Sequence, residues 1–208
     1  MSKGVISPPV PPSVPLTRDL IVATAEDVVR RFGPAKATVV DVARALGVSH
    51  AAVYRHVASK AELRNLVVSR WVDAMMSPLR AIVAQPGPAP ERLRQLFDTL
   101  IAAKRRRYAH DPELFSAYRT LAAETQSVAA HVAELASLAA TIIQAGVGEG
   151  TFRPVDPTVV GRAVLLATSR FHHPAHAADW SDPAIDAQFN EVWQLLMDGL
   201  RPHAPSAA

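Results

Sequence analysis

The sequence has no cysteine, no long apolar run and few aromatic residues. A chain without thiols cannot form disulfides, thiolate zinc sites, iron–sulfur clusters or a cysteine nucleophile, and it suits a reducing compartment. No uninterrupted apolar stretch approaches the roughly 18 residues of a membrane span, and residues 1–15 lack the apolar run of a signal peptide. We therefore expect a cytoplasmic protein with no membrane partner. Its 208 residues, 49% of them hydrophobic, suffice for one large domain or for a small domain joined to a larger one.

Positive charge is concentrated in the first third of the chain. Residues 1–70 carry ten lysines and arginines against five acidic residues, whereas residues 71–208 carry twelve against fourteen. A basic segment of this kind is expected of a protein that binds the phosphate backbone of nucleic acid. Taken alone the signal is weak, because many ordinary domains are equally asymmetric.

Apolar residues recur at helical spacing from Thr17 onward, with no alternating pattern typical of strands. Residues 1–15 contain five of the seventeen prolines and predict a flexible tail, and residues 204–208 are a second expected tail. Capping residues and Gly or Pro breaks predict an all-α protein of about nine helices, over residues 17–32, 39–46, 49–56, 60–83, 90–109, 112–123, 125–146, 157–173 and 184–200.

Two of these helices, 39–46 and 49–56, are short and joined by a turn that contains Gly47. Thr38 and Ser49 are suited to cap them, and Ala43 is small where they must approach each other. This spacing is that of a helix-turn-helix, whose second helix lies in the major groove of DNA. An ordinary helical hairpin in a bundle shares the pattern, so the residues alone leave both interpretations open.

The segment KATVVDVARALGVS at residues 36–49, followed by VYRHV at 53–57 and KAEL at 60–63, resembles the DNA-binding signature of the TetR family of bacterial repressors. The resemblance covers about residues 17–65, and the rest of the chain agrees with the family only in layout. It implies a helix-turn-helix domain over residues 16–62 and a ligand-binding and dimerisation domain over residues 63–203. The chain departs from the family at Ala51, where Gly is frequent, and at Val57, where an aromatic residue is frequent.

The resemblance also implies which side chains meet DNA. Those at helix starts and on the outer face of the recognition helix would contact phosphates, and His50, Ala51 and Ala52 would face bases. The expected DNA-binding residues are Thr38, Ser49, His50, Ala51, Ala52, Tyr54, Arg55, His56 and Lys60.

One recognition helix reads too little sequence for useful specificity, so a protein of this kind should bind as a two-fold dimer on two half-sites. Helices 157–173 and 184–200 offer the broadest apolar faces in the second domain. The alternative is that these faces only close the core of one protomer. The interface candidates are Val164, Phe171, Phe189, Trp193 and Met197.

The family layout implies an effector pocket among helices 60–146. Candidate lining residues are Trp71, Met75, Phe97, Lys104, Tyr108, Phe115, Tyr118 and His131. In the run Lys104 to Arg107 at least one basic side chain must point inward or extend along the apolar stripe, since successive residues turn by about 100°. Such a side chain could pair with an anionic or polar ligand, but for this run we favour solvated charges whose stems cover the core. For His131, which lies among apolar residues, we favour a core histidine with satisfied hydrogen bonds.

Histidines near the end of helix 157–173 suggest a different class of function. His172 and His176 have the i, i+4 spacing of a metal-binding pair, although Pro174 disturbs the helix between them. A third ligand, His131 or His110, would have to come from elsewhere in the chain. On this basis the alternative function is a helical metal-dependent enzyme built on His172, His173 and His176.

The sequence thus predicts a non-enzymatic, TetR-like repressor that needs no cofactor. Its expected partners are palindromic operator DNA, a second copy of the chain and a small-molecule effector that releases the DNA. A DNA-binding dimer without an effector is a third possibility, which an empty and well-packed second domain would support.

Overall fold

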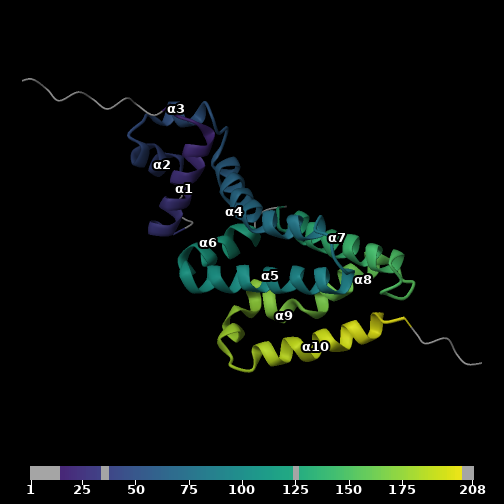
Figure 1. Cartoon of the computed structure of the whole chain (residues 1–208). Coiled ribbons are helices and arrows are strands. Elements are labelled where there is room, and N and C mark those ends of the chain that lie inside the picture. Colours follow the sequence, from purple (N-terminus) through teal and green to yellow (C-terminus); the bar gives the residue numbers. More distant parts are fainter. Residues whose placement is uncertain (1–14, 34–37, 124–126, 203–208) are drawn as a thin grey trace, which may run out of the picture.

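The computed structural model describes residues 15–33, 38–123 and 127–202, and the regular secondary structure among these residues is helical, without strands (Figure 1). Figure 1 shows a small head formed by α1 to α3, joined through α4 to a larger helical body. The elements are α1 (Arg18–Phe32), α2 (Val39–Leu46), α3 (His50–Tyr54), α4 (Lys60–Val83), α5 (Ala89–His110), α6 (Pro112–Ala123), α7 (Ser127–Gly148), α8 (Pro157–Ala167), α9 (Ser169–His172), the 3-10 helix η2 (Pro174–Ser181) and α10 (Ile185–Leu200).

The head has its own core, made by the inner faces of α1, α2 and α3 and by the first turns of α4. Ile21, Val42, Val53 and Leu63 are fully or almost fully buried in it. Val57 lies in the same core, so the smaller side chain at this position still contributes to packing. The family-typical head is therefore complete despite that departure.

The body is a second and larger core around α5. Helix α5 packs against α4, α6, α7 and α9, and α7 packs closely on α8. Helix α10 covers the other side of α5, where Phe97 meets Trp193 with ring centroids 5.5 Å apart (Figure 1). Helix α4 belongs to both cores, with Leu63 and Val67 in the head and Met75 and Leu79 in the body. A single continuous helix thus connects the two parts.

Local sequence signals account for most helix boundaries. Ser59 Oγ accepts a hydrogen bond from the Glu62 N–H at 3.0 Å, and the Glu62 carboxylate accepts the Ala58 N–H, which together start α4. Asp156 accepts the N–H groups of Thr158 and Val159 and starts α8 as predicted. These caps depend on residues within one turn, which is why the sequence alone reveals them.

The predicted single helix over 157–173 is wrong in detail, because the chain bends at Thr168. The Thr168 hydroxyl donates to the Val164 carbonyl oxygen at 2.8 Å, α8 ends there and a short α9 follows. The segment after Pro174, predicted as a break, forms η2. The described residues therefore form two more helical elements than the nine that were predicted.

Helix α7 contains one segment, Ala129–Gly148, that is long and apolar enough, by length and composition alone, to cross a membrane. The sequence prediction found no such segment, because polar residues interrupt the apolar run. In the structure Ala139, Ile142 and Ile143 of α7 are fully buried among the helices of the body. The apolar character of α7 is thus explained by its place in the core.

Candidate DNA-binding surface and ligand cavity

The turn between α2 and α3 has the geometry that a helix-turn-helix requires. Gly47 adopts a left-handed conformation with φ of 67°, which glycine reaches without strain. The Val48 N–H donates to the Ala43 carbonyl oxygen at 3.0 Å and closes the end of α2. Ser49 then caps α3 by accepting the Ala52 N–H at 3.2 Å. The two helices are thereby held in a fixed relation, and the outer side of α3 is left free.

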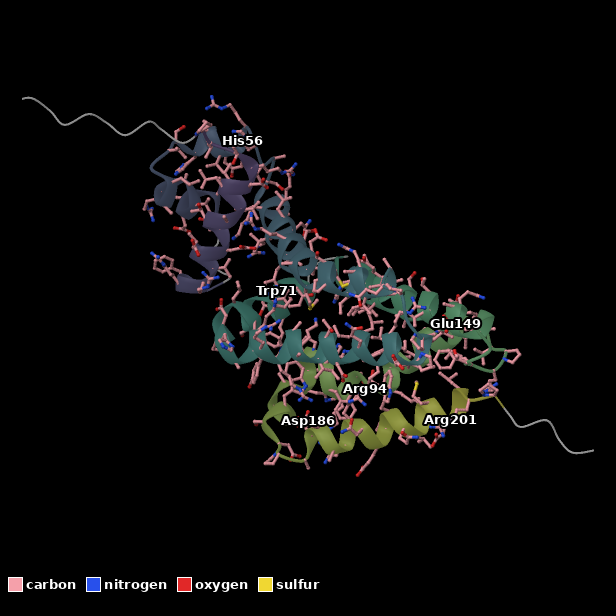
Figure 2. The ribbon with its side chains drawn as sticks, in the orientation of Figure 1. His56, Trp71, Arg94, Glu149, Asp186 and Arg201 are labelled. Atoms are coloured by element: carbon pink, nitrogen blue, oxygen red, sulfur yellow. The ribbon has the colours of Figure 1, made fainter. Side chains whose placement is uncertain are left out.

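Most of the predicted DNA-binding residues lie on this outer surface of the head. The exposed ones are Ser49, His50, Ala51, Tyr54, Arg55 and Lys60, and His56 is partly exposed (Figure 2). Ala52 is different, because it is only 8% exposed and packs inward beside Val53. The prediction that Ala52 faces bases is therefore wrong, since α3 turns this position toward the core.

Thr38 has a local structural role at the start of α2. Its hydroxyl accepts the Asp41 N–H at 3.2 Å and donates to the Asp41 carboxylate at 2.6 Å, which starts α2. Lys60 occupies the first turn of α4 and is exposed there. Both residues lie at helix N-termini, where backbone N–H groups and the helix dipole favour a phosphate.

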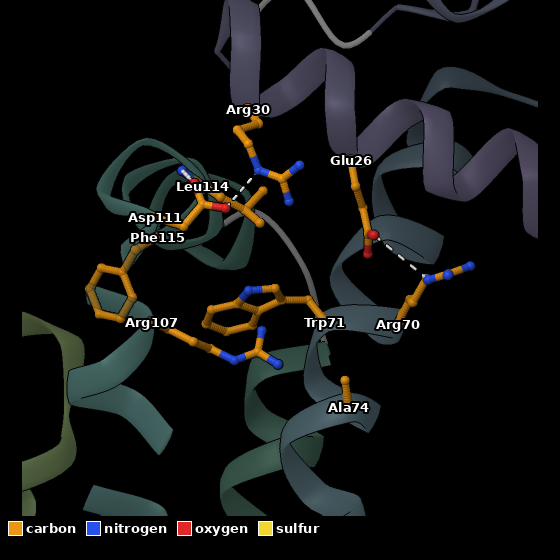
Figure 3. A pocket seen from close by; sticks show the side chains of 9 residues that line it. All are labelled: Glu26, Arg30, Arg70, Trp71, Ala74, Arg107, Asp111, Leu114 and Phe115. Atoms are coloured by element: carbon orange, nitrogen blue, oxygen red, sulfur yellow. Dashed lines mark hydrogen bonds and ion pairs between the residues drawn. The ribbon is translucent and has the colours of Figure 1, made fainter. Parts of the chain in front are cut away.

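A charged pocket of about 250 Å³ lies where the head meets the body (Figure 3). Arg30 of α1 donates through Nε to the Asp111 carboxylate at 2.7 Å, and Arg70 of α4 lies 3.7 Å from the Glu26 carboxylate. The Arg30–Asp111 hydrogen bond raises the pKa of Arg30, and burial raises the pKa of Glu26 against the opposing effect of nearby arginines. Opposite charges therefore join the two parts of the molecule in this pocket.

A second cavity of the body, of about 380 Å³ and called the internal cavity below, lies between α5, α6, α7, α8 and the α9–η2 segment. It is partly open to solvent, because Val132 and Leu166 on its wall are exposed. Its walls combine apolar side chains with several basic ones. The lining residues are Lys104, Tyr118, Arg119, His131, Val132, Leu135, Leu165, Leu166, Ser169, His172, His173, Pro174 and Ala175. The volume falls within the range of about 300–1,000 Å³ that is usual for small-molecule sites.

The polar groups of this cavity are buried without full hydrogen bonding. Lys104 is 3% exposed, and its Nζ lies 5.7 Å from the ring centroids of both Trp71 and Tyr118. Both ring nitrogens of His131 are buried with no hydrogen-bond partner among the described residues. His172 is also buried, and its Nε2 lies 3.3 Å from Thr168 Oγ1. The favoured interpretation of His131 as a satisfied core histidine is therefore wrong.

Burial changes the acid–base behaviour of these groups. It lowers the pKa of Lys104 to about 8, with a smaller contribution from the positive charge of Arg107. Burial and the nearby Lys104 lower the pKa values of His131 and His172 to about 3 each. Burial also raises the pKa of Tyr118 to about 12. At neutral pH the cavity therefore holds a charged lysine, two neutral imidazoles and a neutral phenol.

The predicted ligand-binding residues divide into three groups. Lys104, Tyr118 and His131 line the internal cavity, whereas Trp71 and Phe115 line the pocket at the head. The others do not line either space: Met75 and Phe97 are buried in the core, and Tyr108 packs edge-on against Phe115 and Trp180. The solvated-charge interpretation is wrong for Lys104, which α5 directs inward.

The histidine cluster has a place in the structure, but a different one from the predicted metal site. His172 and His173 line the cavity, and His173 Nδ1 accepts the Ala175 N–H at 3.2 Å. His110 lies elsewhere, bonded to the Arg106 carbonyl oxygen. No group of three or more histidine or acidic side chains within the described part of the chain could hold a metal ion. Sequence reasoning missed these cavity residues because Pro174 and the bend at Thr168 decide where the histidines point.

The predicted dimer residues lie mostly inside the protomer. Val164, Phe171, Phe189 and Trp193 are each less than 7% exposed and pack in the core of the body, while Met197 is partly buried. These apolar faces close the core of one protomer, which is the alternative to a dimer interface that the sequence left open. Large apolar side chains that remain exposed on the same two helices are Val159, Leu166 and Leu195.

Comparison with known families places both parts of the chain. Residues 21–67 match the family model described as bacterial regulatory proteins of the tetR family. Residues 89–193 match the model described as the tetracyclin repressor-like C-terminal domain. No curated protein matches the chain.

Solved structures share the fold at low sequence identity. SmeT, the repressor of a Stenotrophomonas maltophilia multidrug efflux pump, is 17% identical, with a TM-score of 0.67 over 92% of this chain and 95% of its own. A TetR transcription regulator from Haloarcula marismortui is 18% identical, with a TM-score of 0.67 over 89% and 98% of the two chains. A TetR/AcrR regulator from Thermobifida fusca is 24% identical, with a TM-score of 0.57 over 89% and 98%. With family models matching its head and its body, the chain belongs to the TetR family of DNA-binding transcriptional regulators.

Proposed function

We propose that the chain is a ligand-responsive repressor, which binds a palindromic operator as a homodimer and releases it when a small molecule enters the internal cavity. The observation that carries this proposal is the continuity of α4, which begins at the exposed Lys60 and ends in the body. Such a regulator works in the cytoplasm, where its operator lies. The presence of the internal cavity also favours a repressor that responds to an effector over a DNA-binding dimer that has none.

Trp71 is the side chain suited to transmit the ligand signal. Its ring lies with its centroid 3.7 Å from that of Tyr118, which lines the internal cavity. The Arg107 guanidinium also lies 4.6 Å from the Trp71 ring, and it lines the pocket at the head (Figure 3). A ligand that displaces Tyr118 would therefore shift α4 relative to α1. A coupling of about 1–3 kcal/mol suffices to change operator occupancy 5- to 150-fold.

The dimer is proposed to form through the exposed apolar side chains of α8 and α10. Leu195 of α10 is 74% exposed and Val159 of α8 is 50% exposed, so both helices carry apolar surface that a second copy of the chain would cover. Leu195→Asp and Val159→Asp should give a folded monomer that has lost most operator affinity. Sedimentation velocity and operator binding measure both effects, and dimers in both variants would place the interface elsewhere.

The test of DNA binding uses DNA from the region upstream of the protein's own gene, across a salt series. Each phosphate contact contributes a slope of about −0.9 in log K against log salt. Lys60→Ala should make the slope shallower by about two in a dimer, and Tyr54→Ala should weaken binding. Arg106→Ala, which removes an exposed cation of the body, is the matched control and should change neither. Binding that is no tighter than to random DNA, and unchanged in both head variants, would exclude this operator.

A further inference from the structure

The internal cavity holds a positive charge, Lys104, that has no carboxylate partner in the part of the chain that the structure describes. Three other cations of α5 each have a carboxylate within 3.5 Å: Arg92 with Glu149, Arg94 with Asp98 and Arg105 with Asp186. Lys104, on the same helix, has none among the described residues, and it contacts only the π faces of two rings. A buried cation without a counter-ion is costly, so the cavity is electrostatically incomplete without an anion.

His131 adds a second unsatisfied group to the same space. Its two ring nitrogens have no hydrogen-bond partner among the described residues, although the residue is only 5% exposed. A neutral imidazole offers one N–H donor and one acceptor nitrogen. An anionic oxygen in this cavity could therefore accept hydrogen bonds from both Lys104 and His131, which would satisfy two buried groups at once.

The remaining walls restrict the rest of the ligand. Val132, Leu135, Leu165 and Leu166 supply apolar surface from α7 and α8, and the described residues that line the cavity include no acidic side chain. A cationic ligand would meet Lys104 and Arg119 without compensation, and a neutral apolar one would leave Lys104 unpaired. The volume of about 380 Å³ is small for a ligand site and fits a compact molecule.

We propose that the effector is a compact carboxylic acid with an apolar body, whose carboxylate pairs with Lys104 and accepts a hydrogen bond from His131. This inference rests on the proposed function, because it names the chemical class of the effector. Leu135 and Leu165 contact the apolar body. Tyr118, which lines the cavity and stacks on Trp71, is displaced when the carboxylate enters.

The test compares matched probes on the full chain without DNA. Decanoate, decan-1-ol and decylammonium share one apolar body, and 1-naphthoate and 1-naphthalenemethanol form an aromatic pair. Isothermal titration calorimetry should give at least tenfold tighter binding for a carboxylate than for its alcohol, and no binding of the ammonium. Lys104→Met should remove that preference, whereas Arg106→Met, which removes an exposed cation two residues away, should keep it.

Equal binding of carboxylate and alcohol, preference for the ammonium, no binding of any probe, or an unchanged preference in Lys104→Met would each overturn the proposal. The preference of the wild-type chain is decisive even if Lys104→Met does not fold. A ligand-free measurement is also available, since removing an unpaired buried charge should raise the melting temperature by about 2–4 °C. A fall in melting temperature would mean that Lys104 stabilises the ligand-free protein, and it would contradict the inference that its charge is left unpaired.

These outcomes are separate from those of the proposed function. Operator binding and its salt dependence are measured without ligand. The protein can therefore bind its operator as proposed even if none of the carboxylate probes binds. A protein that releases its operator with decan-1-ol but not with decanoate would keep the repressor function and lose the anionic effector.

Discussion

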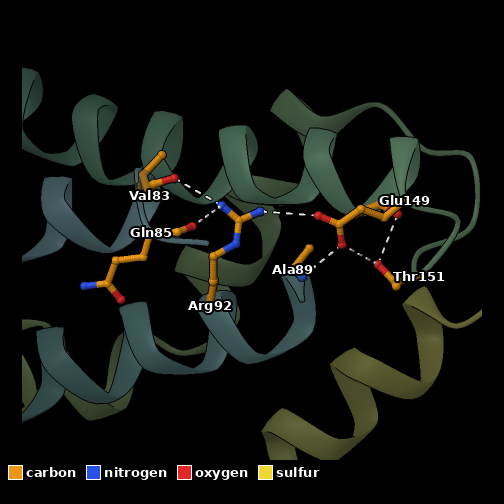
Figure 4. Close-up of polar contacts among 7 residues, drawn as sticks. Val83, Gln85, Ala89, Arg92, Glu149 and Thr151 are labelled. Atoms are coloured by element: carbon orange, nitrogen blue, oxygen red, sulfur yellow. Dashed lines mark hydrogen bonds and ion pairs between the residues drawn. The ribbon is translucent and has the colours of Figure 1, made fainter. Parts of the chain in front are cut away.

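Helix α5 carries two largely buried cations, Arg92 in its first turn and Lys104 in its second half, and the two differ in the groups that surround them. Near the N-terminal end, Arg92 donates to the Val83 carbonyl oxygen at 3.1 Å and lies 3.5 Å from the Glu149 carboxylate (Figure 4). Glu149 also accepts the Ala89 N–H and so caps a helix start that has no side-chain cap of its own. Lys104, three turns further on, is more deeply buried and has no such acceptor among the described residues. Arg92 thus joins helices through its partners, whereas Lys104 remains unpaired and is the group that we propose binds the ligand.

The largest effect that sharpens this comparison is a pH dependence of the unpaired site. His131 and His172 have folded-state pKa values of about 3, below the ordinary value of 6.5, so the unfolded chain binds more protons between these values. Stability is therefore complete above pH 6.5 and falls as the pH is lowered toward 3, by about 2 kcal/mol per histidine between pH 7 and pH 5. Urea unfolding across this range measures the loss.

His131→Gln, which cannot titrate, should remove about half of that pH dependence. Ser169→Ala, which changes a non-titrating residue of the same cavity, is the matched control and should retain it. A pH dependence that is equal in all three proteins would mean that His131 is accessible to protons in the folded state.

The next effect concerns the wall of the cavity. A Cβ on Gly161 of α8 would lie 2.8 Å from both the Ala136 carbonyl oxygen and the Ala140 nitrogen of α7, so Gly161→Ala must separate the two helices. We expect a loss of about 1–3 kcal/mol in the free energy of unfolding, since overpacking has this cost in other cores. The lining residues of α7 and α8 would move apart, while the Arg92–Glu149 end of α5 stays unchanged.

Gly199 provides the matched control for that change. It is also helical, in α10, but a Cβ there would have no atom within 4 Å. Gly199→Ala should stabilise the protein by about 0.5–1 kcal/mol, because alanine loses less backbone entropy on folding. Thermal unfolding measures both variants, and shifts of the same sign would contradict the close approach of α7 and α8.

The comparison of the two cations is tested directly by the same substitution at both positions. Arg92→Met leaves Glu149 without its cation and should destabilise the chain by about 1–3 kcal/mol. Lys104→Met removes a cost and should stabilise it. Opposite signs in urea unfolding would support the distinction, and two destabilised variants would mean that Lys104 also has a structural role.

The smallest effect is expected at the pocket between head and body. The Arg30–Asp111 pair is partly exposed, with 47% of the Arg30 side chain accessible, so solvent screens the interaction. A double-mutant cycle of Arg30→Met and Asp111→Asn should give a coupling of about 0.2–1 kcal/mol that decreases with salt. A salt-independent coupling of several kcal/mol would indicate that the head is held to the body far more firmly than an exposed pair allows.

The head was largely predictable because its signals are local. Gly47 and the caps Thr38, Ser49 and Ser59 act within one helical turn, so their positions in the sequence determine where helices start and stop. Ala52 was misplaced because a five-residue helix has too few turns for apolar spacing to decide which small residue faces inward. The resemblance of this segment to a known family supplied the expected contacts with DNA.

The body was predictable as helices but not as a site. Helical spacing shows that Lys104 and His131 lie on apolar stripes. It does not show whether a neighbouring helix supplies a hydrogen-bonding or charged group to pair with them. Val164, Phe171 and Trp193 form apolar faces that serve a protomer core as well as a dimer, so their role depends on which helix packs on them.

By itself the sequence determined the all-α class, most helix boundaries and the basic character of the head, because these depend on neighbours within a few residues or on composition. Its resemblance to a known family then favoured the helix-turn-helix over an ordinary helical hairpin. Only the tertiary structure decided that Lys104, His131 and His172 share one cavity while Arg92 meets Glu149. The physical reason is that the effect of a buried charge on stability depends on the groups packed against it. Those groups belong to helices that are distant in the sequence.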